Sequence, residues 1–254
     1  MRICRFQTND AIPRWGIIAS DDAIVEISTS GKISGDCLPD PIPLNSVRLL
    51  APCLPSKIVC VGLNYRDHAK EMGKDLPEEP IIFLKPPTSV AGPNDFVILP
   101  NMSEHVDYEA ELALVVGKIA KNIRAEDAKD YILGYTCLND VTARDLQLRD
   151  VQYTRAKGFD SFCPIGPWIE TALDTSSLKI FTRINGIERQ YGNTSQLIFS
   201  PIELLSFVSK IMTLLPGDVI ATGTPAGVGS LSDGDLVEVE IESIGILQNI
   251  VRRG

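Results

Sequence analysis

Residues 106–117 read VDYEAELALVVG, and this stretch, together with YILGYTCLND at residues 131–140, decides the fold. Apolar and polar residues alternate over much of the first segment, and the second is a nearly continuous apolar run. Side chains two residues apart along a strand point to the same side of a sheet. We therefore predict two strands, the first with Glu109 and Glu111 on one face.

Two carboxylates this close together would resist ionising side by side, so a positive group is expected between them. An E-x-E pair in a strand is more often a solvent-exposed face, and Asp140, which ends the second segment, would by itself be taken as a helix cap. Together, Glu109, Glu111 and Asp140 instead predict three oxygen ligands, which suit Mg²⁺ or Mn²⁺. The chain has only two histidines, His68 and His105, so a histidine-rich zinc or copper site is excluded.

The segment before the acidic strand combines a short strand with a polar flap. KIVCVGL (57–63) predicts a buried strand, and NYRDHAKEM (64–72) has helical composition. Polar, proline-bounded KDLPEEP follows, so residues 64–79 are expected to form a mobile flap over a ligand.

His68 and Glu71 lie three residues apart in this flap, and therefore on one side of a single helical turn. A carboxylate orients an imidazole and raises its basicity, as a general base requires. The simpler alternative is a solvated surface helix. His105, in a polar loop, is interpreted as a surface residue.

The remainder of the chain predicts more strand than helix. Asn185-Gly186 between extended segments predicts a hairpin. Ser200-Pro201-Ile202-Glu203 is a capping box, which predicts a helix over about residues 201–213. Because long helices do not alternate regularly with the strands, a doubly wound parallel sheet is excluded. We therefore predict a mainly β, α+β fold with short helices.

The first 50 residues predict a small β unit, in which a hairpin spans Asp21-Asp22. The proline-rich LPDPIPLNSV (38–47) cannot lie inside a sheet or helix, and is interpreted as a linker. The predicted domains are therefore a small N-terminal β domain at residues 1–50 and a catalytic domain at residues 51–254.

The composition is that of an ordinary globular chain with an acidic surface. The 254 residues are 44% hydrophobic and 22% charged, and the net charge is −9. The electrostatic field of this net negative charge repels phosphate backbones and anionic membranes, so neither a nucleic-acid nor a membrane partner is expected. A small acid can still bind where a metal ion or local cations make the electrostatic potential of the site positive.

Sorting and redox signals are weak in this sequence. The N-terminus MRICRFQTND is not a secretion signal, and no window offers about 18 uninterrupted apolar residues. The six cysteines form no C-x-x-C pair. We therefore expect a cytoplasmic protein with reduced thiols.

Three isolated cations and one glycine-rich turn are further candidates for a site. Lys85, Arg144 and Lys157 lie beside proline or glycine, or at the end of an element. In ATGTPAGVGS (221–230), backbone amides and the Thr224 hydroxyl are able to hold a carboxylate. No G-K-[ST] follows the turn, so a nucleotide site is excluded.

Several motifs resemble those of the fumarylacetoacetate hydrolase family, over nearly the whole chain after residue 57. They are GLNYRDHAKEM (62–72), IIFLKPPTS (81–89), DYEAELALVVGK (107–118), LGYTCLNDVTARDLQ (133–147), AKGFDSFCPIGPW (156–168), NGIERQYGNTSQLIFS (185–200) and LLPGDVIATGTPAGVG (214–229). Within the family, the chain resembles the short acylpyruvase and oxaloacetate decarboxylase type, which includes the fumarylacetoacetate hydrolase domain-containing protein 1 members.

The resemblance implies a mixed β-sandwich roll, a homodimer, and Mg²⁺ or Mn²⁺ bound at Glu109, Glu111 and Asp140. It also implies that His68 and Glu71 form a flap dyad that activates water.

The remaining roles follow from the same resemblance. It implies that Lys157 steadies developing negative charge and that Arg144, Gln147 and Thr224 contact the substrate. We expect Lys85, the cation of IIFLKPPTS, to bind substrate with them.

A 2-oxo acid can bind a metal ion through its keto oxygen and adjacent carboxylate, and the ion then absorbs the charge of a pyruvate enolate. We therefore predict metal-dependent cleavage of the C3–C4 bond of a small 2-oxo acid. In acylpyruvate hydrolysis, His68 and Glu71 would activate water, whereas oxaloacetate decarboxylation does not need that attack.

Two alternatives remain open. The first is a tautomerase or isomerase of an oxo-diacid, such as oxaloacetate or 2-hydroxyhepta-2,4-diene-1,7-dioate, in which a proton is moved and no bond is cleaved. The second is a metal-dependent sensor that binds 2-oxo acids without converting them. A sensor has no need of His68 beside Glu71, so the dyad favours an enzyme.

Overall fold

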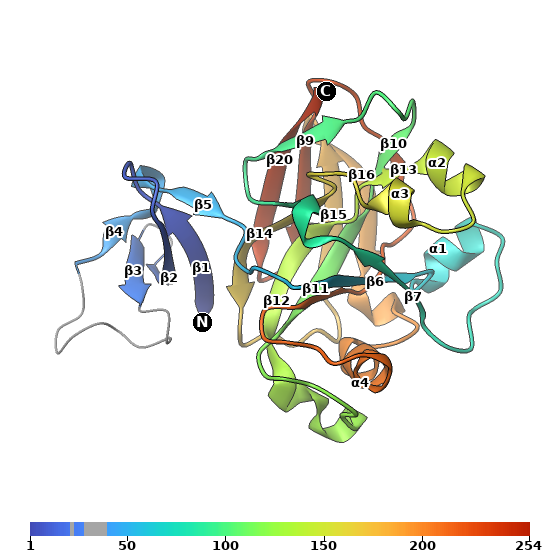
Figure 1. Ribbon diagram of the computed structural model, residues 1–254, viewed down its shortest axis with the longest axis horizontal. Coiled ribbons are helices and arrows are strands. Elements are labelled where there is room, and N and C mark those ends of the chain that lie inside the picture. The colour runs from blue at the N-terminus through green and yellow to red at the C-terminus, as the bar shows by residue number, and fades with distance from the viewer. Residues whose placement is uncertain (21–22, 28–39) are drawn as a thin grey trace.

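A computed structural model describes residues 1–20, 23–27 and 40–254, and confirms a mainly β fold with few short helices (Figure 1). In the described part of the chain, the largest sheet has twelve strands. Its main path runs through β4 (Ile42–Pro43), β3 (Ala23–Ile27), β2 (Pro13–Ser20), β1 (Arg2–Gln7), β14 (Cys163–Glu170), β12 (Ile132–Asn139), β11 (Ala110–Val116), β17 (Val219–Ala221), β6 (Ile58–Gly62) and β7 (Ile81–Lys85). Off this path, β5 (Arg48–Leu50) pairs with β1, and β8 (Val90–Ala91) pairs with β14.

Two smaller sheets complete the β structure. The five-stranded sheet has the order β16 (Ile187–Asn193), β15 (Lys179–Ile184), β19 (Leu236–Ile241), β20 (Gly245–Arg253) and β9 (Phe96–Leu99). The three-stranded sheet has the order β13 (Thr142–Ala143), β10 (Val106–Tyr108) and β18 (Gly229–Ser230). Most neighbouring strands are antiparallel, which agrees with the exclusion of a doubly wound sheet.

The helices are short. The α-helices are α1 (Arg66–Glu71), α2 (Arg144–Arg149), α3 (Thr154–Lys157) and α4 (Pro201–Ile211). The 3-10 helices are η1 (Leu44–Ser46), η2 (Pro87–Ser89), η3 (Ala125–Tyr131) and η4 (Thr194–Gln196). The capping box predicted for α4 is present, because Ser200 accepts from the Glu203 N–H and the Glu203 side chain accepts from the Ser200 N–H. Among the described residues, no helix is long and apolar enough to span a membrane.

Strand β11 is nearly continuously apolar because it is buried on both faces. It lies between β12 and β17, and every one of its residues is buried. Leu112 and Leu114 point into one core, whereas Ala113 and Val115 point into another on the opposite face. A strand covered on both sides does not need the polar alternation of a half-exposed strand.

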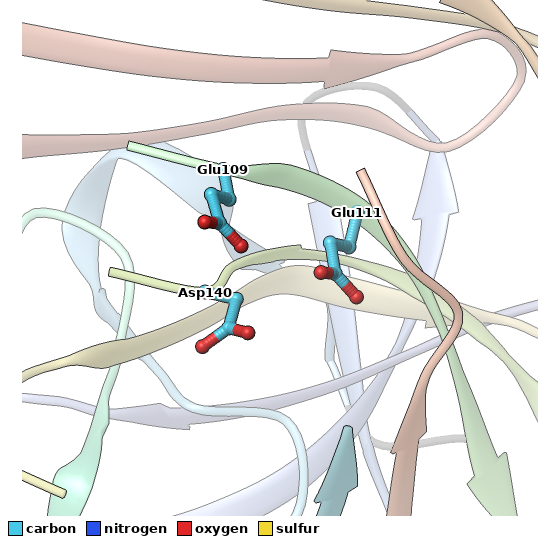
Figure 2. Close-up of side chains that lie close together, drawn as sticks. All are labelled: Glu109, Glu111 and Asp140. Carbon is cyan, nitrogen blue, oxygen red and sulfur yellow. The ribbon is translucent and has the colours of Figure 1, made fainter. Parts of the chain in front are cut away.

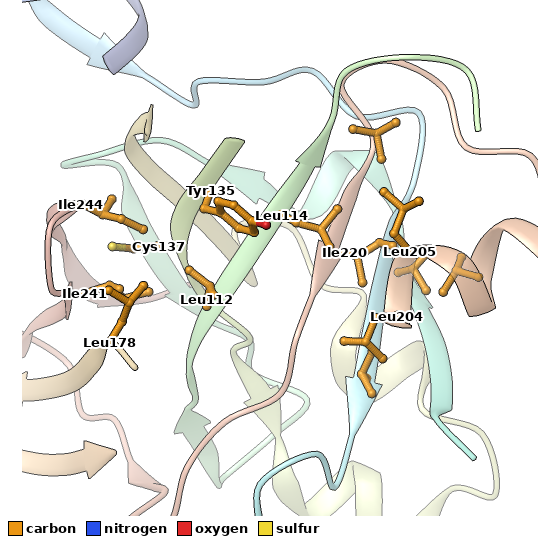
Figure 3. Packing of buried hydrophobic residues seen from close by; sticks show 14 of the residues in the cluster. Leu112, Leu114, Tyr135, Cys137, Leu178, Leu204, Leu205, Ile220, Ile241 and Ile244 are labelled. Carbon is orange, nitrogen blue, oxygen red and sulfur yellow. The ribbon is translucent and has the colours of Figure 1, made fainter. Parts of the chain in front are cut away.

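The first of these cores packs the main sheet against the five-stranded sheet and α4. Figure 3 shows Leu112 and Leu114 between Ile241 on one side and Leu204 and Leu205 of α4 on the other. These contacts hold β11, and therefore the residues at its ends, in a rigid frame.

The predicted hairpin at Asn185-Gly186 is confirmed by the antiparallel pairing of β15 and β16. Asn185 has φ 53° and Gly186 has φ 77°. Positive φ at both central residues is the requirement of the tight type I′ turn, which explains this dipeptide.

The N-terminal strands lie to one side of the main body, at the left in Figure 1, yet they continue the large sheet. β1 pairs with β14 through Arg2–Glu170 and Ile3–Ile169, so hydrogen bonds join the two parts. β2 and β3 pair as predicted, although Asp21-Asp22 lies outside the described residues.

One expectation about the N-terminal region is wrong. Ile42 and Pro43 form the edge strand β4, and a 3-10 helix follows, so this part of the presumed linker has regular structure. Proline is compatible with an edge strand, where one side of the backbone needs no partner. Pro39 lies outside the described residues.

The described cysteines are free thiols and all are buried, which agrees with the prediction of reduced cysteines: Cys4, Cys53, Cys60, Cys137 and Cys163. Cys37 lies outside the described residues.

Candidate metal and active site

Glu109 lies at a break between β10 and β11, which corrects the single strand predicted for residues 106–117. The break is held by two hydrogen bonds. The Glu109 N–H donates to Asn139 Oδ1 at 2.9 Å, and the Glu109 carbonyl accepts from the Asp140 N–H at 2.8 Å. They fix the start of β11 beside the end of β12.

This arrangement brings together the three predicted ligands, Glu109, Glu111 and Asp140 (Figure 2). One carboxylate oxygen from each lies within 4.8 Å of the others, and all three residues are buried. Burial excludes the solvent-exposed face that was the alternative for the glutamates. The helix-cap alternative for Asp140 is also wrong, because the N-cap of α2 is Ala143.

Three cations surround two of these carboxylates. Lys157 Nζ donates to Glu109 Oε2 at 2.9 Å and to Asp140 Oδ2 at 2.7 Å. Lys85 also donates to Asp140, and Arg144 to Glu109. Lys85 and Lys157 are almost completely buried, so these ion pairs are shielded from solvent.

The two glutamates differ in their electrostatic surroundings. Burial alone would raise the pKa of Glu109, but Lys157 and Arg144 hold it below its usual value. For Glu111, burial and then the charges of Asp140 and Glu109 raise the pKa well above its usual value. In the absence of a further cation, Glu111 therefore binds a proton more tightly than an ordinary glutamate does.

The chemistry of this donor set fits a hard divalent cation. Glu111 forms no ion pair with a basic side chain in the described ranges, and its Oε2 accepts from the Gly223 N–H at 2.7 Å. The buried hydroxyl of Tyr65, whose pKa is raised by burial and by the charge of Glu111, has no hydrogen-bond partner in the described part of the molecule. A divalent ion with its bound water would supply the positive charge that Glu111 lacks and a polar partner in this region. Glu109, Glu111 and Asp140 are the residues that would hold it.

The carboxylates line a cavity of about 150 Å³. Its wall consists of Val61, Gly62, Leu63, His68, Met72, Lys74, Ile81, Phe83, Glu109, Glu111, Asp140, Arg144, Gln147, Tyr153, Lys157 and Thr224. Eight of the ten predicted site residues belong to this wall; Lys85 and Glu71 do not. Lys85 lies behind Asp140 and also donates to the Val141 carbonyl at 3.0 Å, so its ammonium faces the ligand set rather than the cavity.

His68 and Glu71 form the predicted dyad. His68 Nδ1 lies 3.0 Å from Glu71 Oε2, and the other Glu71 oxygen accepts from the Gly227 N–H at 3.2 Å. The segment predicted as a flap is partly core, because Asn64 and Tyr65 at its start are buried. Only its middle, residues 70–76, is continuously exposed.

Asp107 is a site residue that sequence analysis missed. Its carboxylate accepts from Arg144 Nε at 2.8 Å, and Arg144 in turn bonds Glu109 and Gln147. His105 Nε2 lies 2.9 Å from the other Asp107 oxygen, and the histidine side chain is half exposed, which agrees with its prediction as a surface residue. Asp107 is two residues before Glu109, so extending the alternation that singled out the glutamates would have found it.

Gln190 is a second residue that was missed. Its Nε2 donates to Thr224 Oγ1 at 2.9 Å, and its Oε1 accepts from the Ala110 N–H at 3.0 Å. It therefore links the glycine-rich turn to the acidic strand. A single glutamine in a hairpin gives no sequence signal of this kind.

Comparison with family models finds two matches in this chain. Residues 57–252 match the model described as "Fumarylacetoacetate (FAA) hydrolase C-terminal", and residues 1–52 match "Rv2993c-like, N-terminal". The first match covers all the site residues described above.

Individual relatives agree with this match. The mitochondrial oxaloacetate tautomerase FAHD2A of Homo sapiens is 47% identical over 223 residues, which is 83% of this chain and 71% of that protein. The solved 5-carboxymethyl-2-hydroxymuconate delta-isomerase of Mycobacterium smegmatis is 47% identical with a TM-score of 0.92, covering 100% of this chain and 99% of that one. The solved maleylpyruvate hydrolase of Sphingobium sp. SYK-6, in complex with manganese(II) and pyruvate, is 32% identical with a TM-score of 0.84, covering 100% of each chain.

Proposed function

Because this chain belongs to the fumarylacetoacetate hydrolase family, we propose that it is a metal-dependent enzyme that interconverts the keto and enol forms of a small 2-oxo dicarboxylic acid, such as oxaloacetate. The observation that carries the proposal is the convergence of Glu109, Glu111 and Asp140 in one cavity with His68. The tautomerase and the isomerase are each 47% identical to this chain, whereas the hydrolase is 32% identical. This order favours proton transfer over the C3–C4 cleavage that the sequence placed first.

The three carboxylates would hold Mg²⁺ or Mn²⁺, which when bound supplies a Lewis acid for the 2-oxo group of the substrate. Lys157 and Arg144 both contact Glu109 and line the cavity. We assign them to stabilising the negative charge that develops on the C2 oxygen as C3 loses a proton. Lys85, which does not line the cavity, is assigned to orienting Asp140.

His68 is the proposed proton carrier. Because Glu71 binds Nδ1, the Nε2 atom is the ring nitrogen left to exchange a proton with the substrate. Nε2 takes a proton from C3, the electrons of that C–H bond form the C2–C3 double bond, and the π electrons of the C2 carbonyl move onto its oxygen, which then receives the proton from Nε2. This proton transfer requires neither water nor a redox partner.

A second candidate is the cleavage of the C3–C4 bond. It is favoured by the likeness to the manganese-containing maleylpyruvate hydrolase and by the position of His68, which would activate water in such a reaction.

The test follows both reactions in the same sample. Protein loaded with Mn²⁺ is mixed with the enol form of oxaloacetate; the loss of enol absorbance reports tautomerisation, and pyruvate is measured separately through lactate dehydrogenase. We expect rapid enol loss, little pyruvate, and inhibition by EDTA. A His68→Ala variant should lose enol conversion while still binding oxalate.

Other outcomes separate the alternatives. Stoichiometric pyruvate, or hydrolysis of acetylpyruvate at a comparable rate, would support C3–C4 cleavage instead. Binding of oxalate without conversion of any substrate would support a sensor.

The family resemblance also leads us to propose a homodimer. Light scattering coupled to size-exclusion chromatography should give twice the mass of one chain, and a monomer would contradict this proposal.

A further inference from the structure

Among the lysines and arginines of the described cavity wall, Lys74 is the one that contacts none of the three proposed ligand carboxylates. It lies beyond the end of α1 and is exposed, together with its neighbour Met72. Arg144 and Lys157, the other cations of the wall, contact Glu109. Within the described residues, the ammonium of Lys74 makes no hydrogen bond or ion pair.

The backbone of Lys74 is held in place by the way α1 ends. Gly73 has φ 62°, its N–H donates to the Lys70 carbonyl at 3.1 Å, and the Lys74 N–H donates to the Ala69 carbonyl at 3.0 Å. This pair of bonds is a Schellman motif, in which the position of Lys74 is usually apolar and packs on the helix. A lysine here departs from that pattern, and its side chain lines the cavity instead.

Lys74 differs from the other cations of the cavity wall because its ammonium has no carboxylate partner among the described residues. Lys157 contacts Glu109 and Asp140, and Arg144 contacts Glu109 and Asp107. A 2-oxo acid with one carboxylate would use that group at the ion and leave Lys74 unpaired, whereas a dicarboxylate places its second charge away from the ion, where Lys74 can pair with it.

We propose that Lys74 binds the distal carboxylate of the substrate and so selects 2-oxo dicarboxylic acids over 2-oxo monocarboxylic acids. This inference rests on the proposed function, because it assumes that the substrate reaches the three-carboxylate site with its 2-oxo end. Lys74 contributes to substrate specificity and takes no part in proton transfer.

The test uses malate and lactate, which are unreactive 2-hydroxy analogues of oxaloacetate and pyruvate. They differ in whether a distal carboxylate is present. Calorimetric titration of the Mn²⁺-loaded protein should show tighter binding of malate than of lactate. Lys74→Met should weaken malate binding about tenfold, as expected for the loss of one charge-assisted hydrogen bond, and leave lactate binding nearly unchanged.

Two further variants complete the design. Lys70→Met removes a positive charge from the same helix, at an exposed residue outside the cavity wall, and should change neither affinity. Lys74→Arg retains the charge and should keep the preference for malate.

The inference is overturned if Lys74→Met weakens both ligands equally, if it leaves the preference for malate intact, or if the wild-type protein does not prefer malate. Its failure is distinguishable from failure of the proposed function. A preference for malate that disappears in Lys74→Met supports the distal site even if oxaloacetate is not tautomerised. Conversely, rapid tautomerisation with an unchanged KM in Lys74→Met overturns the distal site alone.

Discussion

The backbone N–H of Gly227 donates a 3.2 Å hydrogen bond to the carboxylate of Glu71, which also binds His68. The glycine-rich turn after β17 therefore supports the dyad on α1, although 156 residues separate the two partners. A change at Gly227 should therefore act on His68 through Glu71, whereas Gly223, four residues earlier in the turn, is the residue that donates to the proposed ligand Glu111.

Gly227→Ala tests this relationship. Gly227 has φ 93°, and a Cβ there would lie 2.5 Å from the Arg189 carbonyl oxygen, so the turn must shift. We expect kcat/KM for oxaloacetate tautomerisation to fall at least about tenfold as Glu71 loses its partner, with Mn²⁺ affinity retained. The matched control is Gly234→Ala, at φ 88° with no atom within 4 Å of the added Cβ, which should retain full activity. Equal losses in both variants would show that the Gly227 contact is unimportant.

Glu111→Gln tests the metal site by replacing a carboxylate with a neutral group of the same shape. Since hard divalent ions require charged oxygen ligands, Mn²⁺ affinity should fall about 100-fold or more, together with activity. Isothermal titration calorimetry measures the affinity directly. Glu188→Gln, at an exposed residue of β16, is the control and should bind Mn²⁺ as the wild type does. Full Mn²⁺ binding by Glu111→Gln would remove the basis of the proposed site.

Metal affinity should increase with pH. Burial and the charges of Asp140 and Glu109 raise the pKa of Glu111 well above its usual value, so the metal-free protein binds a proton there more tightly than an ordinary glutamate does. A metal ion needs the carboxylate and must displace this proton. Below that pKa, each unit of pH should therefore change the apparent affinity up to about tenfold. Titrations in buffers of different ionisation enthalpy count the protons released; we expect one, and none would contradict the explanation.

Asp107→Asn tests the support of Arg144. The Asp107 carboxylate accepts from Arg144 Nε at 2.8 Å, and Arg144 lines the cavity. Loss of this charge should let the guanidinium move, lowering kcat/KM by about 10- to 100-fold. Because Asp107 is not a proposed ligand, Mn²⁺ affinity should change much less than in Glu111→Gln. A variant with normal kinetics would show that Arg144 needs no such support.

Leu114→Ala tests the contribution of the hydrophobic core that packs against β11. Leu114 is fully buried in the core between the main sheet and α4 (Figure 3). Deleting its side chain leaves a cavity and should reduce the free energy of unfolding by about 2–5 kcal/mol. Leu148→Ala, at a residue that is 82% exposed, should change it by less than about 0.5 kcal/mol. Urea denaturation of both variants measures the difference.

The sequence motifs could not decide between enolisation and C3–C4 cleavage as the main reaction. In the proposed mechanisms, enolisation and hydrolytic C3–C4 cleavage would both use an ion held by Glu109, Glu111 and Asp140 and a base at His68. Because the same donor set serves both, the sequence resemblance placed cleavage first, and the identities to named relatives favour proton transfer.

The sequence by itself determined the features that depend on near neighbours along the chain. The Asn185-Gly186 turn, the capping box of Ser200 and Glu203, and the spacing of His68 and Glu71 are local, and each is present in the structure. The pairing of two acidic residues with a third at the end of the next strand was also predictable, because adjacent antiparallel strands bring such positions together.

The tertiary structure alone decided which charges meet. Lys85 contacts Asp140 across 55 residues, and Lys157 contacts Glu109 across 48 residues. Nothing in the local sequence of either lysine specifies its partner, because the contact exists only after the sheet has assembled and the helices have packed on it. The same assembly buries both glutamates, and the charges that it places beside them separate their pKa values: Lys157 and Arg144 lower the pKa of Glu109, whereas Asp140 and Glu109 raise that of Glu111.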